Sequence, residues 1–124
     1  MKSVITALRR KKMAEATNST GRIAKAKWIA LGSGGVDSQG EVIAPSESAN
    51  SLTTEVIKKE ITKSKKTSDT SYEYSIELSE SELVGTYISE LALIDEDGDV
   101  IAFSNFLSKG KDNIETTFTI EDSY

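Results

Sequence analysis

Hydrophobic and polar positions along the chain predict one helix followed mainly by β-strands. Residues 3–17 follow a helical period, with basic residues between the apolar ones. The apolar stripe of this helix is formed by Val4, Ile5, Leu8 and Met13. Ser3 is its expected N-cap, and Gly21 its expected C-terminal cap. We therefore expect an N-terminal helix that packs its stripe on a sheet.

Three segments after the helix alternate with a period of two, which predicts strands. In residues 23–31, alanines and Trp28 alternate with lysines, so small side chains would let the helix approach closely. Trp28 is then the expected core anchor against the helix. Residues 72–78 and 114–120 alternate apolar and polar side chains, which is typical of strands with one wet face.

The remaining polar segments are less regular. Residues 32–50 and 63–70 are rich in glycine, serine, lysine and other polar residues, so we expect surface loops there. Two alternatives stay open for the segment between these loops. It forms either a short helix over residues 51–59 or a strand over residues 55–62.

A β-hairpin is predicted over residues 85–104. Two apolar runs, at residues 91–94 and 100–103, are joined by an acidic turn in which Gly98 can take a positive φ. Both runs are continuously apolar, which is typical of strands covered on both faces. The N-terminal helix would cover one face, and a second layer or a neighbouring subunit the other. The order of elements favours an α+β fold, with an N-terminal helix packed on a mainly antiparallel, β-sandwich-like sheet.

Length and composition narrow the class of protein. At 124 residues we expect one domain, residues 1–124. We expect neither a transmembrane helix nor a signal peptide, because no apolar run is long enough for either. The chain has no Cys and no His, which removes thiolate nucleophiles, the commonest general base and serine–histidine catalysis. We therefore expect no enzyme and no cofactor.

Charge is distributed unevenly between the two parts of the chain. Residues 1–27 hold eight Lys/Arg and one acid, a net charge of +7, and the rest has a net charge of −12. This polarity suits docking on an acidic partner or on the acidic body of an adjacent copy, with a solvated basic face as the alternative. Arg9 and Arg10 are candidate interface residues of this kind. We expect no nucleic-acid partner, because the chain is acidic overall and no aromatics interleave with the basic residues.

One acidic cluster invites a comparison with calcium sites. Asp95, Asp97 and Asp99 alternate as at the start of an EF-hand loop. The match then fails, since Gly98 falls at loop position four instead of six, and Phe106 stands at position twelve, where a Glu is needed. We expect a solvated turn and no metal site.

Two further patterns have simple structural explanations. Gly32–Gly35 lacks the Lys-Ser/Thr pair of a phosphate-binding loop, so we expect either a flexible turn or close backbone packing there. Glu80 and Glu82 could in principle form a carboxylate pair, but nothing places them in an apolar cleft that would raise a pKa.

The hairpin also carries a family resemblance. It resembles the signature of the phage tail-collar fibre family, the N-terminal domains of phage and prophage tail fibres. The matching positions are Gly85, Tyr87, Ile88, Glu90, Leu93, Asp95, Gly98 and Val100–Ala102. The segment 28–35 is similar to the family's strand and glycine-rich turn, and 52–56 is similar to a third segment. Two departures are the lysines at 58–59, where an arginine is usual, and Ala92, where a glycine is usual.

The resemblance implies a structural component of a phage or prophage tail that attaches to the baseplate through protein–protein interfaces. It implies tail or baseplate proteins as partners and a homo-oligomer, most simply a trimer. It further implies a virion tail component made in the bacterial cytoplasm, with no membrane partner. The candidate interface residues are Tyr87, Ile88, Leu91, Leu93, Ile101, Phe103, Arg9 and Arg10.

A second function from another class stays open, namely a β-rich carbohydrate- or ligand-binding module. Tyr72, Tyr74 and Tyr87 could stack on sugar rings, although two of them share the inward face of one strand. Solvent exposure of Tyr72 and Tyr74 would favour the binding module, whereas self-association or baseplate binding would favour the assembly protein.

Overall fold

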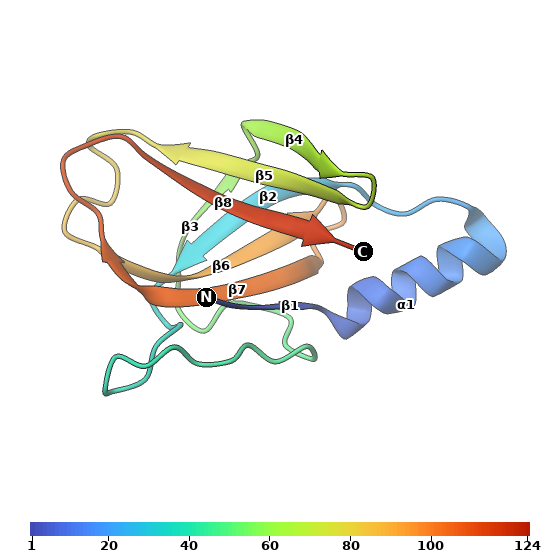
Figure 1. The fold of residues 1–124 in the computed structure, drawn as a ribbon, viewed down its shortest axis with the longest axis horizontal. Coiled ribbons are helices and arrows are strands. Elements are labelled where there is room, and N and C mark those ends of the chain that lie inside the picture. The colour runs from blue at the N-terminus through green and yellow to red at the C-terminus, as the bar shows by residue number, and fades with distance from the viewer.

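Two antiparallel sheets face each other, and one short helix projects from one end of the molecule (Figure 1). The computed structural model describes residues 1–124, except for the side chain of Thr20. In chain order the elements are β1 (Lys2–Ile5), α1 (Ala7–Glu15), the π-helical turn η1 (Ala16–Thr20), β2 (Ala26–Gly32), β3 (Glu55–Glu60), β4 (Lys63–Ser68), β5 (Ser71–Leu78), β6 (Tyr87–Asp95), β7 (Val100–Gly110) and β8 (Thr116–Ser123). The larger sheet has the order β1-β7-β6-β2-β3, and the smaller one β4-β5-β8.

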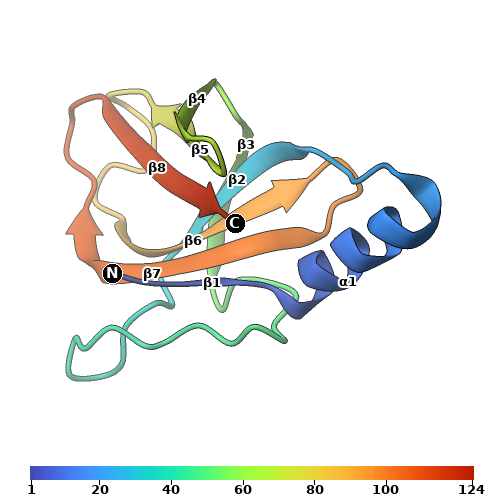
Figure 2. The ribbon, with the colours of Figure 1, turned by 45° about the vertical axis from the view of Figure 1, so that its right-hand side comes forward.

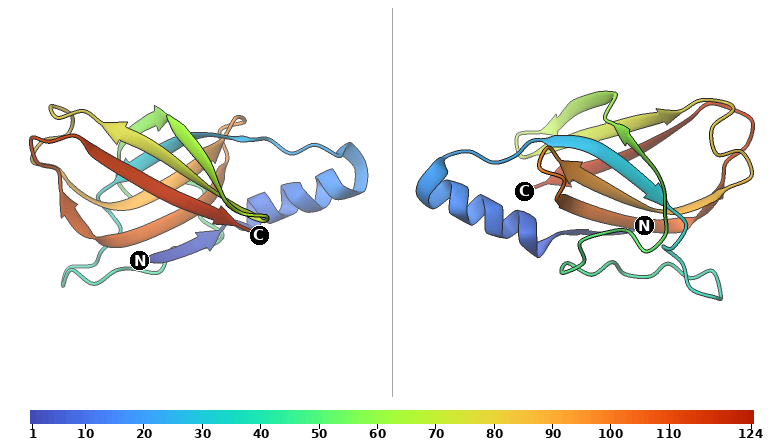
Figure 3. Two further views of the ribbon diagram at one scale, coloured as in Figure 1. Left: turned by 45° about the horizontal axis from the view of Figure 1, so that its top comes forward. Right: turned by 180° about the vertical axis from the view of Figure 1, so that it is seen from behind.

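The predicted α+β class is wrong, because the fold is β-rich. Strands hold 50% of the residues and helices only 11%. The helix does not lie across a sheet as expected; Figures 2 and 3 show α1 extending beyond the ends of the strands. The smaller sheet, rather than the helix, covers the inner face of the larger sheet. No helix among the described residues is long and apolar enough to cross a membrane.

The helix begins later than predicted because the first residues form an edge strand. Val4 pairs with Phe103 of β7, so the expected apolar stripe is divided between a strand and a helix. β-Branched side chains suit this extended conformation. The N-cap is therefore Thr6, whose side chain accepts the N–H of Arg9, rather than Ser3. At the other end, Gly21 caps the helical segment as predicted, with φ of 64° and its N–H bonded to Ala16 O.

The predicted hairpin is confirmed and lies inside the larger sheet. β6 pairs with β7 antiparallel, and Gly98 in the connecting turn has φ of 89°. Apolar side chains on the inner face of the hairpin meet those of the smaller sheet. The core between the sheets contains Ile29, Leu31, Ile76, Leu78, Ile88, Leu91, Leu93, Ile101, Ala102, Phe118 and Ile120.

The outer face of the hairpin is covered by the irregular segment 33–54, which Figure 1 shows running below β1 and β7. Its Leu52 and Ala49 join a second cluster on this face. The sheet contributes Ala30, Ala92, Ile94, Val100 and Phe103 to that cluster. Both faces of the hairpin are thus covered by the chain itself, which explains its continuously apolar strands.

Most of the remaining strand predictions are confirmed. The alternating segments at 72–78 and 114–120 correspond to β5 and β8, and of the two alternatives near residue 55 the strand is correct, as β3. The expected loop over 63–70 is wrong, because its first part forms β4. All six side chains of β4 are exposed, so its pairing with β5 leaves no apolar pattern in the sequence.

Trp28 packs on a different surface from the expected one. Its side chain is partly buried against the outer cluster, and it has no place against the helix. Two lysine ammonium groups lie over its ring, Lys27 at 4.7 Å and Lys58 at 4.5 Å from the centroid. Trp28 is thus an anchor of the outer cluster, with cation–π contacts at its solvent side.

Replacing Trp28 with alanine should lower the free energy of unfolding by about 3 kcal/mol, the low end for truncating a large aromatic side chain in a core. The value is low because the ring is only partly buried. Urea unfolding of the parent and the variant would measure it. A variant as stable as the parent would show that Trp28 adds nothing to the outer cluster.

Candidate assembly interface

The arm, defined here as residues 7–25, projects from one end of the two sheets. The arm leaves the larger sheet at Thr6, whose hydroxyl donates to Val100 O at 2.6 Å and accepts the N–H of Arg9 at 3.1 Å. One buried threonine therefore both ends the pairing of β1 and starts α1. The direction in which the arm projects is fixed at this residue.

Lys12 fixes the arm to the β6–β7 turn. Its ammonium lies 2.8 Å from Asp95, 3.2 Å from Asp97 and 2.6 Å from Asp99. The other oxygen of Asp95 accepts the backbone N–H groups of Asp97 and Asp99, both at 3.0 Å. Burial alone would lower the pKa of Lys12, but the hydrogen bonds to Asp95, Asp99 and Asp97 outweigh it and raise the pKa.

The position of the Lys12 ammonium affects whether Asp95, Asp97 and Asp99 can bind calcium. The three carboxylates lie within 4.8 Å of one another, as ligands of one cation would. The Lys12 ammonium lies among them and supplies the positive charge that a hard cation would otherwise bring. The absence of calcium binding stays a prediction, and the internal ammonium gives it a physical basis that the sequence pattern did not.

Arg9 joins the helix α1 to three other segments. The residue is only 7% exposed in spite of its charge. The guanidinium donates to Ala24 O at 2.6 Å and to the Tyr124 hydroxyl at 3.4 Å, and lies 3.8 Å from Asp95. The Tyr124 hydroxyl donates in turn to Asp122 at 2.9 Å. Arg9 thereby connects the helix with Ala24 at the far end of the arm, with the β6–β7 turn and with the C-terminal end of the chain after β8.

The pKa values of two groups beside Arg9, the Tyr124 hydroxyl and the Asp122 carboxyl, are raised. Burial raises the pKa of Tyr124 to about 12, against the opposing effect of Arg9. Burial also raises the pKa of Asp122, whose hydrogen bond from Tyr124 and nearby Arg9 act in the opposite direction. One Asp122 oxygen is buried with no hydrogen-bond partner among the described residues. The C-terminal end of β8 is thus part of the anchor of the arm.

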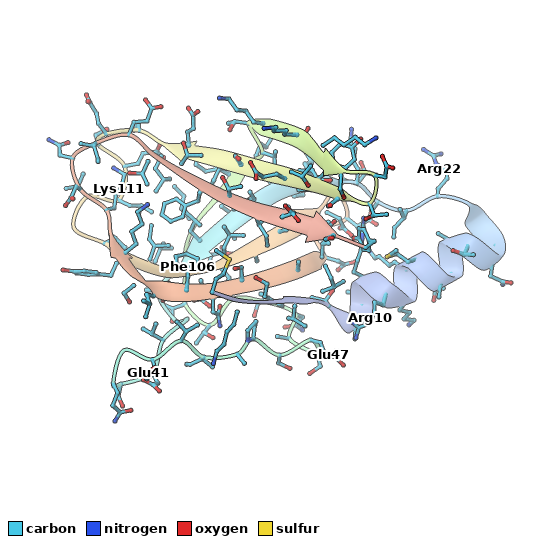
Figure 4. The ribbon with its side chains drawn as sticks, in the orientation of Figure 1. Arg10, Arg22, Glu41, Glu47, Phe106 and Lys111 are labelled. Carbon is cyan, nitrogen blue, oxygen red and sulfur yellow. The ribbon has the colours of Figure 1, made fainter. Side chains whose placement is uncertain are left out.

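A third cation connects the arm with the covering segment 33–54. Arg10 lies 2.6 Å from Glu47, and both are labelled in Figure 4. Both side chains are about half exposed, so the pair stabilises the fold by at most about 1 kcal/mol. The backbone N–H of Ala7 donates to Glu47 O at 2.8 Å. This bond also joins the start of the helix to the segment 33–54, and it does not depend on charge.

Part of the basic charge of the N-terminal segment is therefore met within the chain. Arg9, Arg10 and Lys12 all contact acids of the body. The exposed side chains that remain on the helix include Leu8 and Lys11, and Lys11 has no ion pair with a described residue. The arm thus presents a mixed apolar and basic surface.

The eight candidate interface residues are placed in three different environments. Five lie inside the chain's own clusters: Ile88, Leu91, Leu93, Ile101 and Phe103. Arg9 is buried in the anchor of the arm. Tyr87 and Arg10 alone among the eight are exposed, and they lie on different elements, β6 and α1. A contact between copies through these residues stays a prediction, and only these two side chains present an accessible surface for it.

The glycine-rich turn encloses a buried carboxylate that the sequence reasoning missed. Glu90 of β6 is 2% exposed and accepts the N–H groups of Gly34 at 2.8 Å, Thr53 at 2.9 Å and Thr54 at 2.8 Å. A Cβ at Gly35 would collide with the carbonyl of Ser89. Close backbone packing, one of the two alternatives for this turn, is thus what the structure shows. A single charged residue inside an apolar run was the signal that could have identified Glu90.

The tyrosines of the alternative binding module do not converge. Tyr72 is 45% exposed, but Tyr74 on the same strand is half-buried, and burial raises the pKa of its hydroxyl. Tyr87 begins β6 and pairs with Gly110, whereas Tyr72 pairs with Asp122 beside the arm. Three rings distributed in this way do not form one platform for a sugar.

Comparison with known proteins gives one family. The family described as phage tail-collar fibre protein, N-terminal, matches residues 1–120. Neither a curated protein nor a solved structure shows a significant match to the chain.

Proposed function

We propose that this chain, which belongs to the phage tail-collar fibre family, attaches a tail fibre to the baseplate through protein–protein interfaces. Family membership gives the chain a structural role in a phage tail, as a component of the virion. The observation that carries the proposal is that the family's N-terminal fibre domain matches residues 1–120, almost the whole chain.

The arm is the surface that fits this attachment best. It projects beyond both sheets, so a partner can reach it from several sides (Figure 3). It is also held firmly, because Lys12 and Arg9 bind it to the β6–β7 turn and Arg9 binds it to Tyr124 after β8. A projecting and pre-organised element loses little conformational freedom on docking.

We further propose that the domain has no catalytic activity and no cofactor. The chain contains neither His nor Cys. Two of its three buried carboxylates, Asp95 and Glu90, bond to the Lys12 ammonium and to backbone N–H groups that hold the fold together. The third, Asp122, accepts the Tyr124 hydroxyl beside Arg9. Their environment is that of structural residues rather than of groups poised for proton transfer.

Replacing Leu8 with glutamate should abolish attachment to tails without lowering stability. Leu8 is 39% exposed on the arm, so the substitution places a charge in the proposed contact but not in the core. Tail particles assembled without their own fibres would be incubated with the tagged chain, and bound chain would be measured by sedimentation and located by electron microscopy.

Leu107→Glu is the matched control, since Leu107 is 69% exposed near the end of β7, away from the arm. It should bind tails like the parent. Equal binding by both variants would remove the arm from the proposal. Label found anywhere other than the baseplate region would contradict the proposed place of attachment.

Self-association is the second part of the proposal, with a trimer suggested by the threefold symmetry common in tail fibres. Closed cyclic symmetry would bury exposed side chains without leaving an open end. Light scattering coupled to gel filtration should give the mass of three chains, and Tyr87→Asp should reduce that mass, because Tyr87 is 65% exposed. A monomer at all accessible concentrations would contradict self-association of this domain.

A further inference from the structure

The sandwich is closed along one side and open along the other. On the closed side, β3 of the larger sheet continues into β4 of the smaller sheet through residues 61–62 only. On the open side, β1 is the last strand of the larger sheet and β8 the last strand of the smaller one. Two strand edges therefore face solvent beside the opening between the sheets.

Two apolar hollows follow one another along β8 in this opening. One, of about 240 Å³, has Phe106, Phe118 and Leu91 as its apolar lining, with Thr117 and Thr119 of β8 and Lys109 of β7 at its rim. The Lys109 ammonium lies 5.5 Å from the centroid of the Phe118 ring. The other, of about 190 Å³, lies further along β8 and is lined by residues 120, 121 and 123 together with β1. Figure 4 marks Phe106, whose ring lies 6.2 Å from that of Phe118. Both hollows lie beside the free edge of β8 and offer apolar surface to the side chains of an added strand.

The backbone of β8 presents hydrogen-bonding groups toward this opening. Tyr124 N–H donates to Thr70 O, and Ser75 O accepts from Thr62 N–H on the far side of β5. Because N–H and C=O groups alternate in direction along an antiparallel strand, those of residues 118, 120 and 122 face β5. Those of Thr117, Thr119 and Glu121 face outward, where the described part of the chain offers no further strand.

The edge of β8 is less protected than the other edge of its sheet. The β4 edge carries Lys63, Lys65 and Lys66, a common device against pairing with another chain. The side chains of β8 beside its outward backbone groups are Thr117, Thr119, Glu121 and Ser123, with neither lysine nor proline among them. β8 is also eight residues long, whereas β1 has only four. Its edge is therefore well suited to pair with an added strand.

The charges on the solvent-exposed face of the smaller sheet indicate which charged side chains an added strand would have. The cross-strand register aligns Lys65 with Glu73 and Glu73 with Glu121. Like charges directly opposite each other are unfavourable, and only Glu73 has a basic neighbour on its other side. An added strand with a basic residue opposite Glu121 would restore the alternation of charge.

We propose that the edge of β8 binds an extended segment of a partner protein in which apolar and basic residues alternate. Its backbone pairs with Thr117, Thr119 and Glu121, its apolar side chains enter the two hollows, and its basic side chains lie beside Glu121. A second copy of β8 fits poorly, because residues 115–123 contain no lysine or arginine that could lie opposite Glu121. This surface is distinct from the arm, so the inference goes beyond the proposed attachment.

The probe is an eight-residue peptide of alternating lysine and valine with blocked ends, as long as β8 itself. Calorimetry should show saturable binding to the full chain. Amide hydrogen exchange should slow at Thr117, Thr119 and Glu121. A peptide of the same composition with its lysines and valines in two blocks, and one alternating glutamate and valine, should both bind at least about tenfold more weakly, a loss of 1.4 kcal/mol.

Two variants test the backbone separately from the charge. Thr117→Pro removes an outward N–H without touching the pairing with β5, and it should lose at least about tenfold in affinity, the same 1.4 kcal/mol. Thr117→Val keeps the N–H and should bind like the parent. Glu121→Lys should reverse the preference between the lysine and glutamate peptides. Circular dichroism melting confirms that each variant folds.

Three results would overturn the inference. One is the absence of saturable binding by the alternating peptide, and another is equal binding by Thr117→Pro and Thr117→Val. The third is a dimer of the chain alone that Thr117→Pro dissociates, which would make the occupant a second copy. None of these results bears on tail attachment by the arm, which the Leu8 variant tests by itself.

Discussion

Lys12→Ala should lower the free energy of unfolding by about 3 kcal/mol, the low end for removing one partner of a buried ion pair. The reason is that Asp95 is 1% exposed and would lose the ammonium at 2.8 Å, while Asp97 and Asp99 would repel each other across the gap. Arg9, 3.8 Å from Asp95, would offset part of the loss. Urea unfolding of the variant and the parent measures the difference.

Lys11→Ala is the matched control, because it removes a neighbouring ammonium that has no ion pair in the described structure. It should change the free energy of unfolding by no more than about 0.5 kcal/mol, as is usual for surface substitutions. If both variants unfolded at the same urea concentration, the ion pairs of Lys12 with the acidic turn would not be the contacts that hold the arm in place.

Calcium gives a second measurement on the same variant. Without the Lys12 ammonium, the three carboxylates face one another within 4.8 Å, and about millimolar calcium should raise the melting temperature of Lys12→Ala. The parent should show no such rise and no saturable calcium binding in calorimetry. Calcium stabilising both proteins equally would contradict the view that Lys12 already supplies the positive charge.

The contribution of Lys12 should also depend on pH in a defined direction. The folded-state pKa of Lys12 is raised above its ordinary value of 10.5, so the folded chain binds the proton more tightly than the unfolded chain does. The stabilisation is therefore fully present below pH 10.5 and is lost as the pH rises through the folded-state pKa. The difference in stability between the parent and Lys12→Ala should narrow in that alkaline range and stay constant near neutral pH.

Local patterns in the sequence predicted the parts of the fold that depend on local chemistry. The alternation in 72–78 and the glycine at position 98 were sufficient to identify β5 and the β6–β7 turn. Val4 and Ile5 were misassigned because a short apolar pair fits a helical stripe as well as an edge strand, and only the pairing with β7 distinguishes the two. The paired strand Lys63–Ser68 has no buried side at all, so no hydrophobic pattern could identify it.

The anchor of the arm could not be predicted for a different reason. Lys12 is one of four consecutive basic residues, and its partner Asp95 is 83 positions away. Nothing in the sequence distinguishes it from Lys11, which stays exposed. The sequence did show the acidic turn and the basic segment as separate features. Which single ammonium enters the turn depends on where Thr6 starts the helix, and that follows from the pairing of β1.

Glu90→Ala should release the segment 33–54 from the sheet and lower the free energy of unfolding by about 3 kcal/mol or more. Three backbone N–H groups, of Gly34, Thr53 and Thr54, would lose their acceptor, and each buried donor left unpaired costs about 1–3 kcal/mol. Thr54 also accepts the N–H of Ser33, so part of the turn would keep its connection. Urea unfolding measures the loss of stability, and limited proteolysis within 33–54 measures the release.

Glu41→Ala is the matched control for the proteolysis experiment. Glu41 lies on the same segment, is exposed and has no side-chain bond to a described residue, so its loss should change neither stability nor cleavage. Glu90→Gln should fall between the two, since its amide oxygen can replace only part of the carboxylate's acceptor capacity. If Glu90→Ala were cut no faster than Glu41→Ala, the apolar contacts of Leu52 and Ala49 would be sufficient to hold the segment, and the buried carboxylate would have a different role.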